Sequence, residues 1–179
     1  MPVQRSPLSP PPAHTVRLTF QSKIQDPKSK ISPFSLEISG GFITRLYLPN
    51  EQPADALPLP AEPATEAEKL AARAFAQLQE YQRGTRRTFD LPLQLPAGMT
   101  PFQRRIMAAL LAIPYGETRT YAQLGPARAV GTVCARNPLP LFYPCHRVLP
   151  AHLPKLHPHG HYRGGEPMKA ELLEMERNR

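Results

Sequence analysis

Apolar and polar residues alternate along three short stretches in the first third of the chain, and a period of two is typical of half-buried β-strands. The stretches cover residues 16–20, 34–38 and 42–48. Gly40 and Gly41 separate the last two stretches, and glycine adopts the positive φ that a tight turn needs, so these strands are predicted to form a hairpin. In the third strand we predict that Phe42, Leu46 and Leu48 share one face.

A helix is predicted after these strands. Thr65 and Glu68 have the spacing of a capping box, in which two side chains bond the first free backbone N–H groups of a helix. Apolar residues then recur at helical spacing at positions 70, 74, 78 and 81, and Gly84 ends the pattern. Residues 89–95 are interrupted by Pro92, which has no N–H to donate, so they are predicted as an edge strand.

These elements predict a small α/β domain over residues 14–97, and nothing in it resembles a reaction centre. The preceding residues 1–13 are rich in proline and lack apolar periodicity, so they are predicted to be a disordered tail. A second domain is predicted over residues 98–179. Proline makes up 24 of the 179 residues, so long uninterrupted helices should be few.

The second domain is predicted to be helical. Thr100 and Gln103 have capping-box spacing, with a proline at the first helical position between them. Apolar residues at positions 102, 106, 110 and 113 form one helical face, which Pro114 ends. Residues 169–177 carry enough apolar side chains for a short closing helix.

Two short helices in the middle of this domain suggest a helix-turn-helix. Residues 120–124 are long enough for one turn, and Gly125 follows as a break. A helix of small residues is then predicted over 127–136. It carries Arg128 and Arg136, two cations that suit a DNA phosphate backbone.

Positive charge is concentrated in the second half of the chain. Residues 1–98 hold 11 basic and 9 acidic side chains, whereas residues 99–179 hold 11 and 5, for a net charge of +8. Between 99 and 165 Glu117 alone opposes basic residues at positions 104, 105, 119, 128, 136, 147, 155 and 163. Such a stretch attracts a polyanion, although a solvated surface that only aids solubility would have the same composition.

Composition argues against several classes of protein. No apolar run approaches the ~18 residues that a membrane-spanning helix needs. No basic segment followed by an apolar core opens the chain as a secretion signal would. Cys134 and Cys145 are the two cysteines, too few for a disulfide framework, so a reducing intracellular compartment is expected.

Cys145 is the candidate nucleophile. A thiol reacts as its thiolate, and a neighbouring imidazole or cation lowers the thiol pKa by favouring the charged form. His146 and Arg147 are the next two residues, and the imidazole can act through a bridging water with a carboxylate behind the ring. A buried structural cysteine is the alternative.

Segment 137–148, with Asn-Pro followed by Pro-Cys-His-Arg-Val, resembles the active-site signature of the methylated-DNA–protein-cysteine methyltransferases, the alkylguanine DNA alkyltransferases. Further similar motifs, in the family's order, are TPFQ at 100–103, YGETRTY at 115–121, RAVG at 128–131 and YRGG at 162–165. The similarity covers residues 89–179 well and the first domain in outline. It implies an α/β (α+β) protein, with a ribonuclease-H-like N-terminal domain and a helical C-terminal domain that holds a helix-turn-helix and a cysteine loop.

The resemblance also implies the reaction. Members of the family move an alkyl group from the exocyclic oxygen of guanine in DNA onto their own cysteine, once per molecule. Carried over, Cys145 is the acceptor, His146 the base acting through water, and Glu176 the carboxylate that orients the ring. No cofactor and no metal are implied.

The remaining site residues follow from the same resemblance. Arg128 corresponds to the family's finger residue, which enters the duplex. Such a residue is needed because chemistry on a base requires the nucleotide out of the stack. An ordinary phosphate contact is the alternative for Arg128. Tyr121 corresponds to the residue that rotates the target phosphate and lines the pocket, with a core aromatic as the alternative. Asn137 ties the helix to the cysteine loop. The substrate pocket is assigned to Tyr121, Pro140, Val148, Tyr162 and Arg163, and DNA binding to Tyr121, Arg128 and Arg136.

The chain departs from the family pattern in three places. Only six residues separate Tyr121 from Arg128, fewer than is usual. The segment between Val148 and Tyr162 is long and holds histidines at 152, 157, 159 and 161. We expect these histidines to be solvated rather than to bind a metal ion. The first domain has no cysteine for a zinc site, and Cys134 is expected to be a packing residue.

The sequence therefore predicts stoichiometric repair of alkylated guanine in double-stranded DNA by a monomer that does not enter membranes. The expected compartment is the cytoplasm, at the nucleoid, in a prokaryotic host and the nucleus in a eukaryotic one. Two alternatives stay open. One is a lesion-binding protein that transfers nothing, which the short Tyr121–Arg128 spacing permits. The other is a cysteine hydrolase with no role in DNA.

Overall fold

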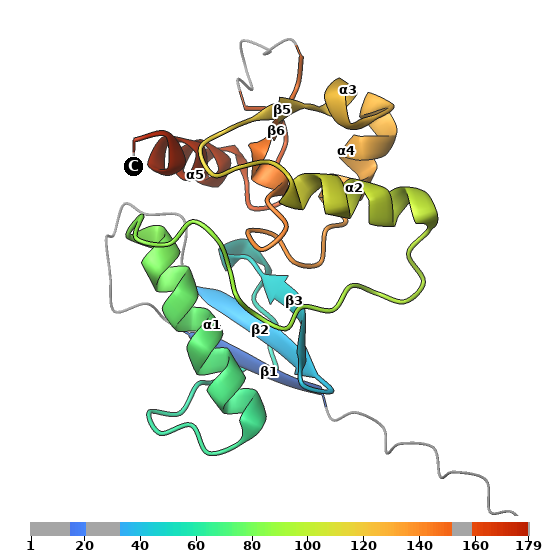
Figure 1. Ribbon diagram of the computed structural model, residues 1–179. Coiled ribbons are helices and arrows are strands. Elements are labelled where there is room, and N and C mark those ends of the chain that lie inside the picture. Colours follow the sequence, from blue (N-terminus) through green and yellow to red (C-terminus); the bar gives the residue numbers. More distant parts are fainter. Residues whose placement is uncertain (1–14, 21–32, 152–158, 179) are drawn as a thin grey trace, which may run out of the picture.

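A four-stranded sheet and a group of short helices make up the computed structural model, which describes residues 15–20, 33–151 and 159–178 (Figure 1). The strands lie in the order β3-β2-β1-β4, antiparallel except for the parallel pair of β1 and β4. Their bounds are Thr15–Phe20 for β1, Phe34–Ser39 for β2, Phe42–Tyr47 for β3 and Leu57–Pro58 for β4. The fold is therefore a mixture of α and β structure, as the sequence predicts.

The hairpin of β2 and β3 is confirmed, but one residue of its buried face differs from the prediction. Gly40 and Gly41 have φ values of 58° and 81° and pair Ser39 with Phe42. A β-bulge then shifts the register beyond Ile38. The extra residue reverses the alternation, so Phe42 is 42% exposed and Ile43 is fully buried in its place.

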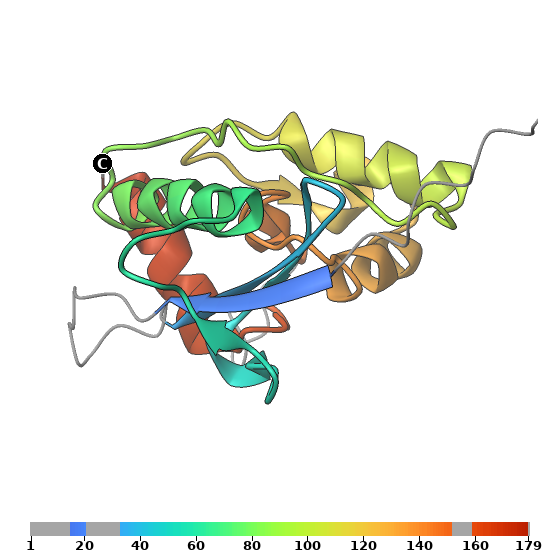
Figure 2. The same cartoon turned by 90° about the horizontal axis from the view of Figure 1, so that it is seen from below.

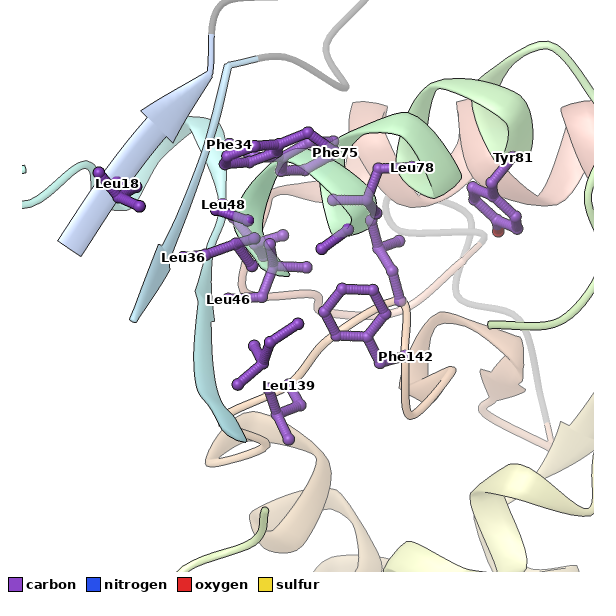
Figure 3. Packing of buried hydrophobic residues seen from close by; sticks show 14 of the residues in the cluster. Leu18, Phe34, Leu36, Leu46, Leu48, Phe75, Leu78, Tyr81, Leu139 and Phe142 are labelled. Atoms are coloured by element: carbon purple, nitrogen blue, oxygen red, sulfur yellow. The ribbon is translucent and has the colours of Figure 1, made fainter. Parts of the chain in front are cut away.

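Helix α1 (Glu66–Gln82) lies across the sheet (Figure 2). Its capping box is present, with Thr65 Oγ1 accepting from the Glu68 N–H at 3.2 Å. Phe75 and Leu78 of this helix pack toward the strands (Figure 3), and Tyr81 at its end is also fully buried. The amphipathic face predicted from the apolar spacing is thus the face that closes the core.

Residues 89–95 do not form a full edge strand. They make one parallel bridge, between Leu93 and Ile43 of β3. The Ile43 N–H donates to the Pro92 carbonyl at 2.8 Å, and the Gln94 N–H donates to the Ile43 carbonyl at 3.0 Å. Pro92 has no N–H of its own, which limits how far the pairing extends.

The remaining elements are short. The helices are η1 (Pro49–Glu51), α2 (Pro101–Leu111), α3 (Tyr121–Leu124), α4 (Ala127–Ala135), η2 (Cys145–Arg147) and α5 (Glu166–Arg177), and β5 (Arg119–Thr120) pairs with β6 (Val148–Leu149). Capping boxes begin α2 at Thr100 and α3 at Thr120. None of the helices in the described ranges is long and apolar enough to cross a bilayer.

The segment that leads to Cys145 joins two hydrophobic clusters. Leu139, Leu141 and Phe142 belong to the cluster under the sheet, where Figure 3 shows Leu139 and Phe142 beside the strand residues. Cys145 and Val148 belong to the cluster between α2 and α4. Leu141 has a φ of 69°, a conformation that costs about 1–3 kcal/mol and persists where surrounding packing holds it. The backbone before the cysteine is therefore fixed from both sides.

Candidate active site

Cys145 is the first residue of η2 and is 4% exposed. It lines a cavity of about 580 Å³. The other lining residues are Tyr121, Gly131, Cys134, Ala135, Pro150, Gly160, His161, Tyr162 and Arg163. The structure thus brings Tyr121, Tyr162 and Arg163 to the candidate nucleophile. Pro140 and Val148, also predicted for the pocket, are buried but do not line this cavity.

Asn137 holds the sulfur directly. Its Nδ2 donates to Cys145 Sγ at 3.2 Å and to the Tyr143 carbonyl at 2.8 Å, while its Oδ1 accepts from the Leu139 N–H at 3.0 Å. The predicted link between helix and cysteine loop is present. The contact with the sulfur is an addition, and it favours the thiolate because a donor stabilises negative charge.

Glu176 on α5 is the centre of a buried hydrogen-bond network. His146 Nε2 lies 2.8 Å from Glu176 Oε1, and Tyr81 Oη donates to the same oxygen. Arg147 donates from Nη2 to Oε1 and from Nε to Oε2, both at 2.9 Å. The Gly116 N–H donates to Oε2 at 3.2 Å. The sequence predicted the pair of His146 and Glu176 but not the other three donors.

The network determines which nitrogen of His146 is free. An ionised Glu176 carboxylate only accepts, so the proton of a neutral imidazole lies on Nε2. Nδ1 then keeps its lone pair. It is buried and has no hydrogen-bond partner among the described residues. His146 can therefore take up one proton at Nδ1.

Burial favours the neutral forms of both Cys145 and His146. It raises the pKa of the Cys145 thiol, against the opposing effects of Asn137, Arg163 and Lys169. It also lowers the pKa of His146, against the opposing hydrogen bond and charge of Glu176. The cations that act on the sulfur are Arg163 and Lys169, whereas Arg147, two residues after the cysteine, turns to Glu176.

Glu176 remains ionised in this network. Burial alone would raise its pKa, but the hydrogen bonds and charges of His146 and Arg147 outweigh burial and lower the pKa from 4.5 to about 2. That shift corresponds to about 3 kcal/mol of differential stabilisation.

The stability of the protein should consequently fall with acidification. The folded pKa of Glu176 is depressed, so its contribution is present above pH 4.5 and is lost as the pH falls through about 2. The folded pKa of His146 lies below 6.5, so protons also favour the unfolded chain below that pH. Urea unfolding at pH 7, 5 and 3 should give a steadily lower midpoint. A constant midpoint over this range would contradict the network, and Glu176→Gln should reduce the slope.

Lys169 of α5 is a buried cation beside the cavity. Its Nζ donates to the Val148 carbonyl at 2.7 Å and lies 5.9 Å from the centre of the Tyr121 ring. Burial lowers the pKa of Lys169 to about 8, although the two thiols and Glu166 act in the opposite direction. The carbonyl of Val148, a residue assigned to the substrate pocket, thus accepts a hydrogen bond from this ammonium group.

Arg163 is held by residues from both parts of the chain. Its Nε lies 2.9 Å from Glu51 Oε1, and its Nη1 donates to the Asn137 carbonyl at 2.8 Å. Asn50 Nδ2 in turn donates to the Arg163 carbonyl at 2.8 Å. The wall of the cavity is thus tied to η1 as well as to the cysteine loop.

Several cations of the second half face solvent. Arg128 at the start of α4 and Arg136 at its C-terminal cap are exposed, as are Arg104 and Arg105 on α2. Arg147, another basic residue of the second half, is 6% exposed because its guanidinium binds the buried Glu176. The solvent-facing positive charge is therefore smaller than the sequence indicated, but it includes both predicted DNA-binding arginines.

The histidine-rich segment shows no metal site where it is described. His152 and His157 lie outside the described residues. The His159 N–H lies 3.5 Å from Glu166 Oε1, and His161 lines the cavity. Over residues 15–20, 33–151 and 159–178, no three metal-ligating side chains cluster together.

Cys134 packs in the hydrophobic cluster between α2 and α4 and also borders the cavity. It is 9% exposed and lines the same cavity as Cys145. Burial, and then the neighbouring Cys145, raise its pKa to about 12. At neutral pH Cys134 is therefore a protonated thiol and a weaker nucleophile than a thiolate.

The chain is similar to known proteins of one family. The family model described as "6-O-methylguanine DNA methyltransferase, DNA binding domain" matches residues 101–178. A methylated-DNA–protein-cysteine methyltransferase of Mycobacterium leprae is 36% identical over 159 residues, which cover 84% of this chain and 89% of the relative. The chain belongs to the methylated-DNA–protein-cysteine methyltransferase family.

Two further members of this methyltransferase family are close to the chain. The constitutive methyltransferase of Bacillus subtilis is 44% identical over 114 residues, covering 60% of this chain and 68% of its own length. The crystal structure of Mycobacterium tuberculosis OGT in complex with DNA has a TM-score of 0.70 at 33% identity, and the match covers 90% of this chain and 92% of that one. The similarity thus extends over both parts of the fold.

Sequence reasoning missed four residues that contact the site. Gly116 has a φ of 78°, and a Cβ there would lie 3.0 Å from the backbone carbonyl oxygen of Glu176, so glycine is favoured at this position. Tyr81 was assigned only to an apolar helix face, and Arg147 only to the thiol. Glu51, which pairs with Arg163, carries no motif or periodic pattern in the sequence.

Proposed function

We propose that this methyltransferase transfers the alkyl group from the exocyclic oxygen of an alkylated guanine in double-stranded DNA onto Cys145. The observation that supports this most strongly is the placement of the Cys145 sulfur at a cavity, with Asn137 donating to it. His146 is the next residue in the chain, and its ring pairs with the buried Glu176 of α5. Nucleophile, base and orienting carboxylate are the components of thiol nucleophilic catalysis.

The reaction is a displacement. The Cys145 thiol gives its proton, through a bridging water, to Nδ1 of His146, and Glu176 stabilises the imidazolium that forms. The sulfur attacks the alkyl carbon, a carbon–sulfur bond forms, and the bond between that carbon and the guanine oxygen breaks. The guanine anion released takes up one proton, which balances the proton that the thiol gave to His146, and leaves as unmodified guanine. The thioether product has no hydrolytic route back, so each molecule acts once.

The target base has to leave the duplex before it meets the sulfur, at a cost of roughly a few kcal/mol. Arg128 fills the gap in the duplex, Tyr121 rotates the target phosphate and lines the pocket, and Arg136 contacts the backbone. The exposure of both arginines and the place of Tyr121 in the cavity support these roles. Tyr162, Arg163, Pro140 and Val148 shape the pocket and recognise the guanine edge.

The same proposal covers the finer architecture. Residues 14–97 form a ribonuclease-H-like domain, and residues 98–179 form a DNA-binding and alkyl-transfer domain. Helices α3 and α4 are its helix-turn-helix, with α3 reduced to a single turn by the short Tyr121–Arg128 spacing. The protein acts as a monomer inside the cell, at the nucleoid or in the nucleus according to the host.

The mass of the intact protein tests this function. Incubation with a duplex that carries O6-methylguanine should replace one hydrogen by one methyl per chain, and peptide mapping should place it on Cys145. Lesion binding without a mass change would indicate the lesion reader instead. A protein that ignores the duplex would leave the cysteine hydrolase.

Arg128→Ala should slow repair of duplex DNA at least tenfold while changing the reaction with free O6-methylguanine base far less. The reason is that a free base needs no flipping, so the few kcal/mol of unstacking do not apply to it. The rate of methyl uptake measured on both substrates checks this. Equal slowing on both would remove the flipping role of Arg128, and Arg104→Ala on α2 is the matched control.

A further inference from the structure

Tyr81 brings a hydroxyl group from the sheet-covering helix into the hydrogen-bond network of Glu176. It lies in the last turn of α1, is fully buried, and its ring is at the end of the core nearest the helices (Figure 3). Its Oη donates to Glu176 Oε1 and lies 3.3 Å from His146 Nε2. The other donors to this carboxylate all come from residues 116–147.

The contact is more specific than burial of an aromatic ring requires. A core helix position is filled equally well by phenylalanine, as Phe75 fills its own in the same helix. A phenol in this place supplies a neutral donor that a carboxylate oxygen can share with His146 and Arg147. Burial, and then the charge of Glu176, raise the pKa of Tyr81 well above 10, so the hydroxyl stays a donor throughout the working pH range.

We propose that Tyr81 is a positioning residue for alkyl transfer, whose hydroxyl fixes Glu176 Oε1 against His146 Nε2 and shares the negative charge of the carboxylate. The proposal rests on the proposed function. It makes the first half of the chain part of the proton relay, because the residue that aligns His146 for the thiol proton comes from α1.

The charge sharing has a definite direction. The groups that face His146 and Glu176 are Tyr81 from α1, Arg147 from η2, Lys169 from α5, and Tyr115, whose ring lies 5.9 Å from that of Tyr81. Without the Tyr81 hydroxyl, Oε1 loses a donor and its charge acts more fully on His146. The imidazolium is then stabilised, and the pKa of His146 rises.

Tyr81→Phe in the full chain tests the proposal, with Tyr47→Phe as the matched control. Tyr47 Oη donates to Glu37 at 3.0 Å, so the control also removes a phenol–carboxylate bond, but in the sheet. Rates of methyl transfer from duplex DNA and from free O6-methylguanine are measured from pH 5 to 9, together with an NMR titration of His146. Tyr81→Phe should slow transfer about tenfold on both substrates, the effect of one hydrogen bond to a charged group. It should also move the acid limb of the profile to higher pH.

Several outcomes would overturn the inference. One is an unchanged rate and an unchanged His146 titration in Tyr81→Phe; another is a loss matched by Tyr47→Phe. If Tyr81→Phe folds poorly by thermal melting, 3,5-difluorotyrosine at position 81 retains the hydroxyl and lowers its pKa. This stronger donor should move the acid limb to lower pH, and no such movement would also overturn the inference. If the unaltered protein transfers nothing, the proposed function fails first and the role of Tyr81 fails with it.

Discussion

Replacing Cys145 with alanine is expected to abolish methyl transfer while leaving lesion binding in place. The Cys145 sulfur lines the cavity and accepts a hydrogen bond from Asn137. The next residue in the chain, His146, pairs with the Glu176 carboxylate. The alanine variant keeps the cavity walls, so the everted base still has a site. Intact mass after incubation with methylated duplex should show no added methyl, and a gel-shift titration should show binding to the same duplex.

Cys134→Ala is the informative control, because Cys134 lines the same cavity, whereas the Asn137 amide donates to the sulfur of Cys145. This variant should still gain one methyl per chain. Methyl uptake by Cys145→Ala would reassign the acceptor to Cys134. Loss of uptake in both variants would show that the two thiols act together, against the single-acceptor mechanism.

Arg147→Met is expected to destabilise the fold by about 3–5 kcal/mol, the cost of leaving a buried charge without its partner. Arg147 donates two hydrogen bonds to Glu176 and a third, from Nη1, to the Ile113 carbonyl at 2.7 Å. Its loss leaves the carboxylate with Tyr81, His146 and Gly116 but no permanent cation. Thermal melting at pH 7 should show a fall of at least about 6 °C.

A double variant separates charge from packing. Arg147→Met with Glu176→Leu removes both charges and should be more stable than Arg147→Met alone, since an apolar pair replaces an uncompensated ion. Urea unfolding of the two proteins gives the comparison. A double variant no more stable than the single one would show that packing of the guanidinium, and not the unpaired carboxylate, carries the cost.

Local signals in the sequence were sufficient for most of the elements. Capping boxes at Thr65 and Thr100 and the glycine pair at 40–41 act within a few residues, so helix starts and the hairpin turn could be predicted from them. The bulge that exposes Phe42 could not, because it depends on how β3 pairs with β2. The extent of the strand predicted over residues 89–95 was too large for the same reason. Its pairing depends on β3 and on the backbone around Pro92.

The sequence by itself determined the chemistry: a Pro-Cys-His-Arg-Val run, a glutamate in the closing helix, and an arginine at the start of a small helix. Tertiary structure alone decided the protonation states of Cys145 and His146. The pKa of Cys145 rises and that of His146 falls because both are buried, and burial is a property of all surrounding elements. It also decided that Tyr81, 65 residues before His146, reaches Glu176. Contacts over such separations leave no periodic or local pattern, since only packing of the sheet-covering helix against the helical part creates them.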